Sequence, residues 1–401
     1  MKKSIPEIRF NGFNNEWQQC KLLDIVQLYN GLTYSLNDIV DSEGTLVLRS
    51  SNVKNDEVVD ADNVYVKSDI INCENVKKDD IIVVVRNGSR ALIGKHAQIK
   101  KVMPNTVIGA FMTGMRSEHP EFVNVLLSAP AFDHEVEKNM GATINQITNG
   151  MFAEMQFMIP MEEEQDRIGE CFYNLDHLIT LSQQKYDKLI ATKKSMLDKM
   201  FPKKGYNVPE IRFKGFDEPW ENLMFCDLFK ERREKTEKEN EDILLSCAIN
   251  GIFLNTELFG HFRGTTTVGY LKVKKNDLIL SAQNLHLGNA NVNLRFEHGI
   301  ISPAYKVYDI ISCDPCFINT WLKKTDTKNF FLAATTEGAS QCRKNIEWNT
   351  LDKQNIFVPS FKEQKLIGKY FFQLDNLITL QHQELEKLKN IKKSLLDKMF
   401  V

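Results

Sequence analysis

The feature that most constrains this chain of 401 residues is that it repeats itself. The segment "KKSMLDKMF" ends at Phe201, and "KKSLLDKMF", which differs at one position, ends at Phe400. An opener segment also recurs, as "IPEIRFNGFNNEW" from Ile5 and as "VPEIRFKGFDEPW" from Val208. Such self-similarity predicts two halves built on one plan. Each half consists of an opener, a globule and a shared C-terminal block.

The shared block is predicted to be a long helix. Residues 172–201 and 371–400 are identical at 18 of 30 positions, and apolar residues recur at alternating steps of four and three. This spacing is a heptad seam. A helix from Glu162 to Phe201 would hold 40 residues and span about 60 Å. The predicted apolar seam positions are Phe172, Leu175, Ile179, Leu189 and Met196 in the first block and Phe371, Leu374, Ile378, Leu388 and Leu395 in the second.

Polar residues interrupt both seams at the same places, Ser182 and Lys193 in one block and Gln381 and Lys392 in the other. Polar seam residues fix register and partner choice. Acidic residues gather at the start of the first block and lysines at its end, which suits the helix dipole. Two such helices laid antiparallel would set acidic ends against basic ends. We therefore predict an internal antiparallel coiled coil with pseudo-two-fold symmetry; alternatively, each helix packs on its own globule or on another protein.

Composition sets broader limits. Hydrophobic residues make up 42% and charged residues 26% of the chain, as in ordinary globular proteins of two or more domains. The start of the chain has no apolar stretch of the secretory kind, and no run is long enough to cross a membrane, so a cytoplasmic protein is expected. Cys313 and Cys316 form an isolated CxxC, for which a structural role is favoured over a zinc or redox site. With a net charge of −2, any nucleic-acid binding must come from local patches or partner subunits.

The two globules share part of their sequence. "VKKDDII" starting at Val76 matches "VKKNDLI" starting at Val273, among short runs rich in Val, Ile and Tyr. We predict an α+β fold in which two β-rich domains of mixed structure are separated by the two long helices. The predicted boundaries place the two β-rich domains at residues 1–160 and 204–359 and the two long helices at residues 161–203 and 360–401.

The globules diverge directly after the shared strand. One continues "VVVRNGSRALIGK" and the other "LSAQNLHLGNANV"; a second variable segment reads "TINQITNG" in one half and "SQCRKNIEW" in the other. Arg, Gln and Asn are the side chains that read base edges in DNA, although any one of them could be an ordinary polar loop residue. The predicted DNA contacts are Arg86, Asn87, Ser89, Arg90, Lys95, Asn145 and Gln146 in the first half and Gln283, Asn284, His286, Gln341, Arg343 and Lys344 in the second.

With these segments in place, the whole chain resembles the specificity subunit of type I restriction–modification enzymes. The resemblance is carried by the two openers "PEIRF.GF", the "P…EEQ" and "P…KEQ" segments that begin each helix, the tails "KKS(M/L)LDKMF" and the repeated "VKK.D(I/L)I". It implies two target-recognition domains, each of which reads one half of a bipartite double-stranded DNA site, with the helices setting the gap. It also implies two methyltransferase subunits that carry S-adenosylmethionine and modify adenine, and two restriction subunits that use ATP and Mg²⁺.

The resemblance implies no catalytic residue in this chain, and the motifs agree. The chain has no Pro-Pro pair and hence no Asn/Asp-Pro-Pro-Tyr/Phe motif of an amino-methyltransferase, and it has no HExxH. The segment from Gly88 to Lys95 has five residues between its glycines where a P-loop has four. Glu363, Lys365 and Asp352 resemble a nuclease triad, but the lysine is lost in the repeat. The alternative functions are a coiled-coil scaffold without DNA specificity and, less favoured, a standalone nuclease or methyltransferase.

Overall fold

The computed structural model describes residues 5–140, 145–260, 266–340 and 343–401. The chain divides into two compact units: unit 1 comprises Met1–Gln183 and Gln383–Val401, and unit 2 comprises Gln184–His382. The sequence-based boundaries treat the spacer helices as separate segments. By contact, however, each unit combines one globule with part of both long helices.

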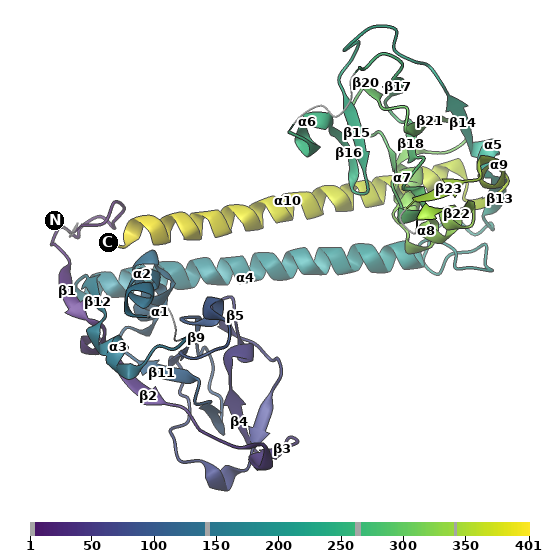
Figure 1. The fold of residues 1–401 in the computed structure, drawn as a ribbon. Coiled ribbons are helices and arrows are strands. Elements are labelled where there is room, and N and C mark those ends of the chain that lie inside the picture. Colours follow the sequence, from purple (N-terminus) through teal and green to yellow (C-terminus); the bar gives the residue numbers. More distant parts are fainter. Residues whose placement is uncertain (1–4, 141–144, 261–265, 341–342) are drawn as a thin grey trace. The chain divides into compact units, whose positions relative to one another are not determined.

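The shared blocks form the two long helices, α4 (Glu162–Lys199) and α10 (Phe361–Met399), which Figure 1 shows. Three glutamates occupy the first turn of α4, and Lys199 and Lys398 occupy the last turns of α4 and α10. This placement of charge opposes the helix dipole at each end. The structure is therefore the predicted mixture of α and β elements, with two long helices of about the expected length.

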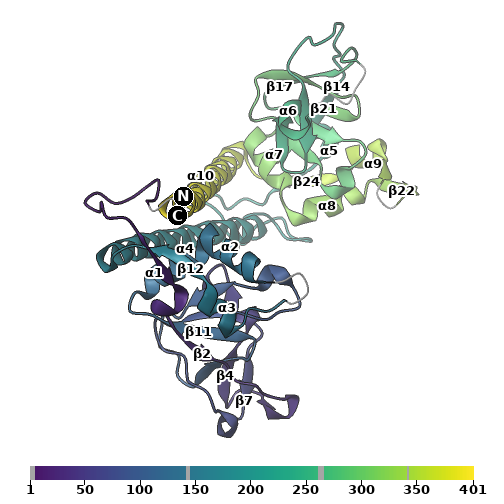
Figure 2. The same cartoon turned by 60° about the vertical axis from the view of Figure 1, so that its left-hand side comes forward.

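The first globule, in unit 1, holds a four-stranded antiparallel sheet of order β2-β11-β8-β9 and a second sheet of order β10-β4-β7-β3. In both views the second sheet lies farther from α4 than the first (Figure 1, Figure 2). The strands are β1 (Gln18–Lys21), β2 (Gln27–Asn30), β3 (Ile39–Val40), β4 (Thr45–Leu48), β5 (Val53–Lys54), β6 (Glu57–Val58), β7 (Val64–Val66), β8 (Ile81–Val84), β9 (His96–Gln98), β10 (Thr106–Ile108), β11 (Met112–Arg116) and β12 (Gln156–Ile159). The helices are α1 (Pro120–Ser128), α2 (Pro130–Asn139) and α3 (Asn149–Glu154).

The second globule, in unit 2, repeats the first sheet as β14-β21-β18-β19, with every neighbouring pair antiparallel. The strands are β13 (Glu221–Met224), β14 (Phe229–Arg232), β15 (Leu245–Ala248), β16 (Gly251–Leu254), β17 (Leu271–Lys274), β18 (Leu278–Ser281), β19 (Ala290–Val292), β20 (His298–Ile301), β21 (Tyr305–Ile310), β22 (Thr335–Ser340), β23 (Arg343–Ile346) and β24 (Asn355–Val358). The helices are α5 (Phe225–Leu228), α6 (Asn255–Leu258), α7 (Pro315–Leu322), α8 (Thr325–Leu332) and α9 (Trp348–Asp352). The two globules therefore share a central sheet, although their sequences differ over most of its length.

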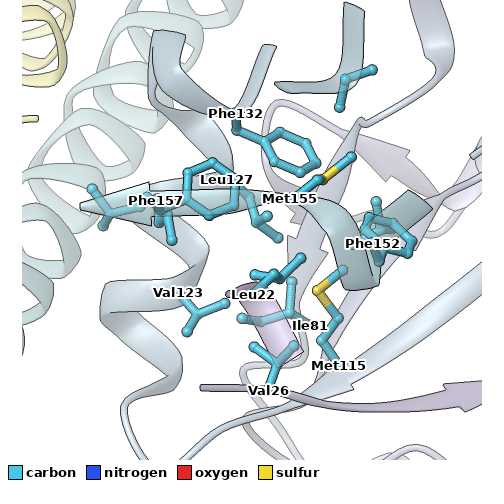
Figure 3. Close-up of a cluster of buried hydrophobic side chains, with 14 of the residues drawn as sticks. Leu22, Val26, Ile81, Met115, Val123, Leu127, Phe132, Phe152, Met155 and Phe157 are labelled. Atoms are coloured by element: carbon cyan, nitrogen blue, oxygen red, sulfur yellow. The ribbon is translucent and has the colours of Figure 1, made fainter. Parts of the chain in front are cut away.

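The core of unit 1 lies between its β2-β11-β8-β9 sheet and helices α1, α2 and α3, as Figure 3 shows. Leu22, Ile81, Phe152 and Met155 are fully buried in it. Strand β8 carries apolar side chains on both faces because one face packs against these helices and the other against the second core cluster of the globule. This double burial explains why the shared strand reads as a continuous apolar run.

The repeated "VKK(D/N)D" motif forms the turn that precedes this strand. Asp79 and Asn276 adopt positive φ angles of 73° and 71°, a conformation that Asp and Asn tolerate better than most residues. The next carboxylate closes the turn: Asp80 accepts a hydrogen bond from the backbone N–H of Lys77 at 2.8 Å. Asp277 does the same in unit 2. The motif is therefore accounted for by turn geometry.

The same carboxylates are each neutralised by an arginine, but from different strands. In unit 1, Arg116 on β11 donates to Asp80 at 2.9 Å. In unit 2, Arg232 on β14, the counterpart of β2, donates to Asp277 at 3.0 Å. Tyr29 occupies the β2 position in unit 1 and donates its hydroxyl to Asp80 at 2.7 Å; burial, together with this carboxylate, raises the pKa of Tyr29. A buried charge requires a partner, and the two globules meet that requirement differently.

The opener segments are held by buried ion pairs. Arg9 donates both Nε and Nη2 to the carboxylate of Glu164, at 2.7 and 2.8 Å. Arg212 binds Glu363 in the same two-pronged way, at the same distances. Both glutamate side chains are almost completely buried. The "EIRF" of each opener and the Glu-Gln at the start of each helix are therefore the two sides of one interaction.

The tail motifs complete each junction. In unit 1 the ring of Phe400 lies 6.0 Å from that of Trp17 and 6.5 Å from that of Phe172. In unit 2 Phe201 lies 5.6 Å from Trp220 and 6.5 Å from Phe371. Within each unit, the end of one long helix thus packs against an opener and the start of the other helix. This arrangement explains why opener, helix start and tail are repeated together.

Candidate nucleic-acid interface

The first candidate loop follows β8, where the chain leaves the core. Val85 is buried and Arg86 is exposed. The Asn87 side chain braces the loop, since its Nδ2 donates to Ser50 Oγ at 3.0 Å and its Oδ1 accepts from the backbone N–H of Ser89 at 3.0 Å. Asn87 therefore uses both ends of its amide inside the protein and stabilises the loop. The side chain of Arg86, in the same loop, is exposed.

The structure brings the second candidate loop of unit 1 beside the first. Arg86 and Gln146 form an isolated antiparallel bridge. Asn145 donates its side-chain amide to the Gly88 carbonyl at 3.2 Å. The remaining predicted contacts from the first loop, Ser89, Arg90 and Lys95, are all exposed. The structure thus joins the two predicted loops of the first half, 60 positions apart in sequence, through Arg86, Asn145 and Gln146.

A residue that sequence reasoning missed completes this surface. Phe111, in the turn between β10 and β11, is 55% exposed, and the guanidinium of Arg86 lies 5.0 Å from the centre of its ring. The Phe111 carbonyl accepts hydrogen bonds from the backbone N–H groups of Val85 and Arg86, at 3.0 and 3.2 Å. The cation–π contact holds the Arg86 side chain on one face of the ring.

A hollow of about 490 Å³ opens beside Phe111. The ends of strands β2, β4 and β10 contribute its walls, so several loops meet at the same end of the domain. Arg49 donates to the carbonyl of Asp62 at 2.6 Å, while its buried Nε has no hydrogen-bond partner among the described residues. The lining side chains that could meet a ligand are those of Thr33, Tyr34, Arg49, Ser50, Ser51, Asp62 and Phe111. In the sequence, the only sign of this hollow is the polar segment "RSS", residues 49–51, directly after the apolar strand β4.

In unit 2 the corresponding loop follows β18. Gln283 is exposed and Asn284 is half-buried. The backbone N–H of Ala282 donates to the carbonyl of Ala304 at 3.1 Å, as Val85 does to Phe111 in unit 1. This equivalent bond places Gln283 in the position of Arg86 and Ala304 in the position of Phe111.

The other predicted contacts of unit 2 fare differently. His286 is only 9% exposed, and neither of its ring nitrogens has a hydrogen-bond partner among the described residues. Its 3₁₀ turn, Leu285–Leu287, packs against α8, so the ring does not lie at the surface as predicted. Lys344 is half-buried on β23. Gln341 lies outside the described residues, and Arg343 is described in its backbone alone.

The seam positions are the least exposed side of each long helix. In α4, Phe172 and Leu175 are buried and Ile179, Leu189 and Met196 are half-buried. In α10, Phe371 and Leu374 are buried, and Ile378, Leu388 and Leu395 are half-buried.

The lysines that interrupt the seams pair with aspartates. In unit 1 the Nζ of Lys392 lies 2.8 Å from Asp176 of α4 and 3.3 Å from Asp56. In unit 2 Lys193 lies 2.5 Å from Asp375 of α10. Burial alone would lower the pKa of Lys392, but the carboxylates of Asp176 and Asp56 outweigh it and the pKa is raised. Each seam lysine therefore pairs with a specific aspartate on the facing helix.

Neither a cluster of metal ligands nor a membrane-spanning helix is present in the part of the chain that the structure describes. No group of three or more His, Cys, Asp or Glu side chains there could hold a metal ion. Cys313 is buried, which raises its pKa to about 12, as for a structural thiol. Among the described helices, none combines the length and the apolar character that a membrane span requires.

Comparison with known proteins shows to which family the chain belongs. The model of the type I restriction modification DNA specificity domain matches the chain twice, over residues 14–191 and 192–390. The chain belongs to the family of type I restriction–modification specificity subunits. The two matches cover both halves of the repeat, so each half is one specificity domain.

Individual relatives agree with this assignment. The chain is 23% identical over 419 aligned positions to the putative type I restriction enzyme MjaX specificity subunit of Methanocaldococcus jannaschii, covering 95% of this chain and 92% of that protein. It is 24% identical over 163 residues to the type I restriction enzyme StySPI specificity subunit of Salmonella potsdam, covering 38% of this chain but only 35% of that protein. The crystal structure of the type I restriction–modification system S subunit from M. genitalium has the same fold, with a TM-score of 0.57, 16% identity and 99% of each chain covered.

Proposed function

We propose that each target-recognition domain of this specificity subunit reads one half of an asymmetric, bipartite double-stranded DNA site. The observation that carries the proposal is the contrast at one strand end: the same sheet and the same backbone hydrogen bond present Arg86 and Phe111 in unit 1 but Gln283 and Ala304 in unit 2. A constant framework with different base-reading side chains is what two different half-sites require. Exposed cations such as Arg90 and Lys95 would hold the phosphate backbone.

The long helices are proposed to form an antiparallel coiled coil that sets the unread gap between the half-sites and relates the two halves by a pseudo-two-fold axis. Support comes from the pairing of each seam lysine with an aspartate of the facing helix, Lys392 with Asp176 and Lys193 with Asp375. These residues are equivalent in the sequence repeat. Two equivalent charge pairs, one in each unit, would permit a single register for the two helices.

Two methyltransferase subunits are proposed to bind the helices. The same positions of both repeats carry exposed apolar side chains: Tyr173, Leu178 and Leu181 on α4, each about half exposed, and Phe372, Leu377 and Leu380 on α10. At about 100° per residue, Tyr173 and Leu181 lie on the side of α4 away from its seam and Leu178 lies beside the seam, and the three equivalent residues of α10 are arranged in the same way. Exposed apolar patches of this kind mark protein interfaces. S-adenosylmethionine would belong to these partners, and ATP and Mg²⁺ to two restriction subunits.

The proposed function is tested by measuring how the complex with its methyltransferase partner binds duplex DNA as the salt concentration rises. Phosphate contacts release counterions, so the affinity should fall steeply between about 50 and 200 mM salt. A scaffold without DNA specificity would show no preference for one bipartite duplex over a scrambled one, and that result would exclude our proposal.

Replacing Arg86 by alanine should relax recognition in one half-site only. If the guanidinium binds a guanine edge, the change costs about 1–3 kcal/mol on the cognate sequence and little elsewhere. Binding to duplexes with every substitution in each half-site measures this directly. Equal weakening on all sequences would instead assign Arg86 to a phosphate.

Lengthening the helices should lengthen the gap. One heptad inserted into α4 after Gln183 and one into α10 after His382 preserve the seam, and add about 10 Å of helix, or about three base pairs. The variant should select a site with a longer spacer and unchanged half-sites. A variant that binds DNA with the original spacer would contradict the role of the helices as spacers.

The exposed apolar residues of the two long helices predict how many methyltransferase subunits bind. Leu181→Glu or Leu380→Glu should each reduce the complex from two methyltransferase subunits to one, and the double variant should bind none, because a carboxylate would be buried at each interface. Native mass spectrometry counts the subunits. Leu36→Glu is the matched control, since Leu36 is an 87% exposed leucine outside the two long helices. Retention of two subunits by the double variant would place the interface elsewhere.

A further inference from the structure

We propose that Phe111 is a specificity-determining residue of unit 1, which reads a thymine through contact with the 5-methyl group of the base. This inference rests on the DNA-reading function proposed above. It adds a residue that lies outside the two loops, around Arg86 and Gln146, in which the sequences of the two halves diverge.

The fold does not require the Phe111 side chain. The ring is 55% exposed, in a protein whose other phenylalanines include many that are fully buried. Its structural contribution is made by the backbone, through the bonds from its carbonyl to the N–H groups of Val85 and Arg86. At the same place in unit 2, Ala304 keeps the equivalent backbone bond and has no ring at all. The ring is therefore an addition specific to one recognition domain.

The surroundings of the ring leave its chemistry available. The Arg86 guanidinium covers one face at 5.0 Å, and the hollow lined by Tyr34 and Arg49 opens beside Phe111. The ring is thus held next to a cation that binds guanine or phosphate, at a loop end proposed to meet DNA. Phenylalanine contributes to base reading through apolar contact with the methyl group that thymine alone presents in the major groove. Arg86 and Phe111 would then read neighbouring base pairs.

The test replaces each thymine of the half-site, one at a time, by deoxyuridine, which lacks only the methyl group. For the complex of the intact chain with its methyltransferase partner, one replacement should weaken binding about fourfold, the value of one buried methyl group. For Phe111→Ala the same replacement should have no effect, and for Phe111→Leu an intermediate one. Arg86→Ala should leave the effect of the replacement in place.

The outcomes separate the inference from the function on which it rests. If the intact complex discriminates its bipartite site but no deoxyuridine replacement matters, or if the effect persists in Phe111→Ala, the role of Phe111 is wrong and the proposed function stands. If Phe111→Ala loses discrimination only at the G·C pair that Arg86→Ala also affects, and keeps the effect of deoxyuridine, Phe111 only positions Arg86, which also overturns the inference. If the intact complex does not discriminate bipartite DNA at all, the proposed function fails first.

Discussion

Replacing Arg212 by alanine is expected to lower the free energy of unfolding of unit 2 by about 3–5 kcal/mol. The reason is that Glu363 is fully buried and its carboxylate is held by two hydrogen bonds from Arg212. Removing the arginine leaves that charge in the interior without its partner, which costs more than the pair contributes. Urea unfolding followed by tryptophan fluorescence reports mainly on this unit, because three of the four tryptophans lie in it, among them the buried Trp220 at the end of the opener.

Two variants make this result specific. Lys214→Ala changes an exposed cation two residues along the same opener and should alter stability by no more than about 0.5 kcal/mol. Replacing both partners by apolar residues, Arg212→Met with Glu363→Leu, should recover most of the loss, because no buried charge remains. A loss as large for the double variant as for Arg212→Ala would show that packing of the arginine stem, and not the ion pair, holds the opener.

Gly169→Ala is expected to lower the free energy of unfolding of unit 1 by about 1–3 kcal/mol, the usual cost of overpacking. A methyl group at Gly169 would lie 2.8 Å from both the backbone nitrogen of Phe122 and the Cβ of Glu121. Backbone cannot move aside as a flexible side chain can, so α1 would have to withdraw from α4 and open the core around Phe122. Gly368 makes the same close approach to Phe317 in unit 2, so Gly368→Ala should destabilise that unit similarly.

The control for this prediction is Gly150→Ala in α3. Its added methyl group would meet nothing closer than 3.8 Å. An alanine there should be neutral or raise stability by up to about 1 kcal/mol, because alanine favours the helix. Thermal unfolding of both variants distinguishes close packing from helix propensity. Equal effects at Gly150 and Gly169 would mean that the α1–α4 contact is looser than described.

The repeat made much of this fold predictable. The heptad spacing predicted both long helices, and Arg9 and Glu164 recur in the sequence as Arg212 and Glu363, although only the structure shows that each arginine binds its glutamate. Glycine at equivalent places in the two helices, Gly169 and Gly368, also recurred. The repeat marked these segments as shared, but that they pack together at each junction is visible only in the structure.

The recognition surface was only partly predictable. Arg86 and Gln146 were found because they lie where two alignable segments diverge, and the structure joins them. Phe111 was missed because the turn between β10 and β11 has no recognisable repeat in the sequence, and its match to Ala304 is visible only through backbone hydrogen bonds. His286 is buried in a turn that packs against α8, a contact that its sequence register with Ser89 does not reveal.

The most direct test of the central claim, that this chain gives a modification complex its DNA sequence, is a map of methylated adenines in host DNA with the gene intact and deleted. Our account predicts one asymmetric two-part motif with a fixed gap, which is lost on deletion and restored by the intact gene. In cells that carry Arg86→Ala, one half of the motif should be relaxed and the other unchanged. A methylation pattern that is the same with and without the gene, in a host whose methyltransferase partner is active, would contradict it.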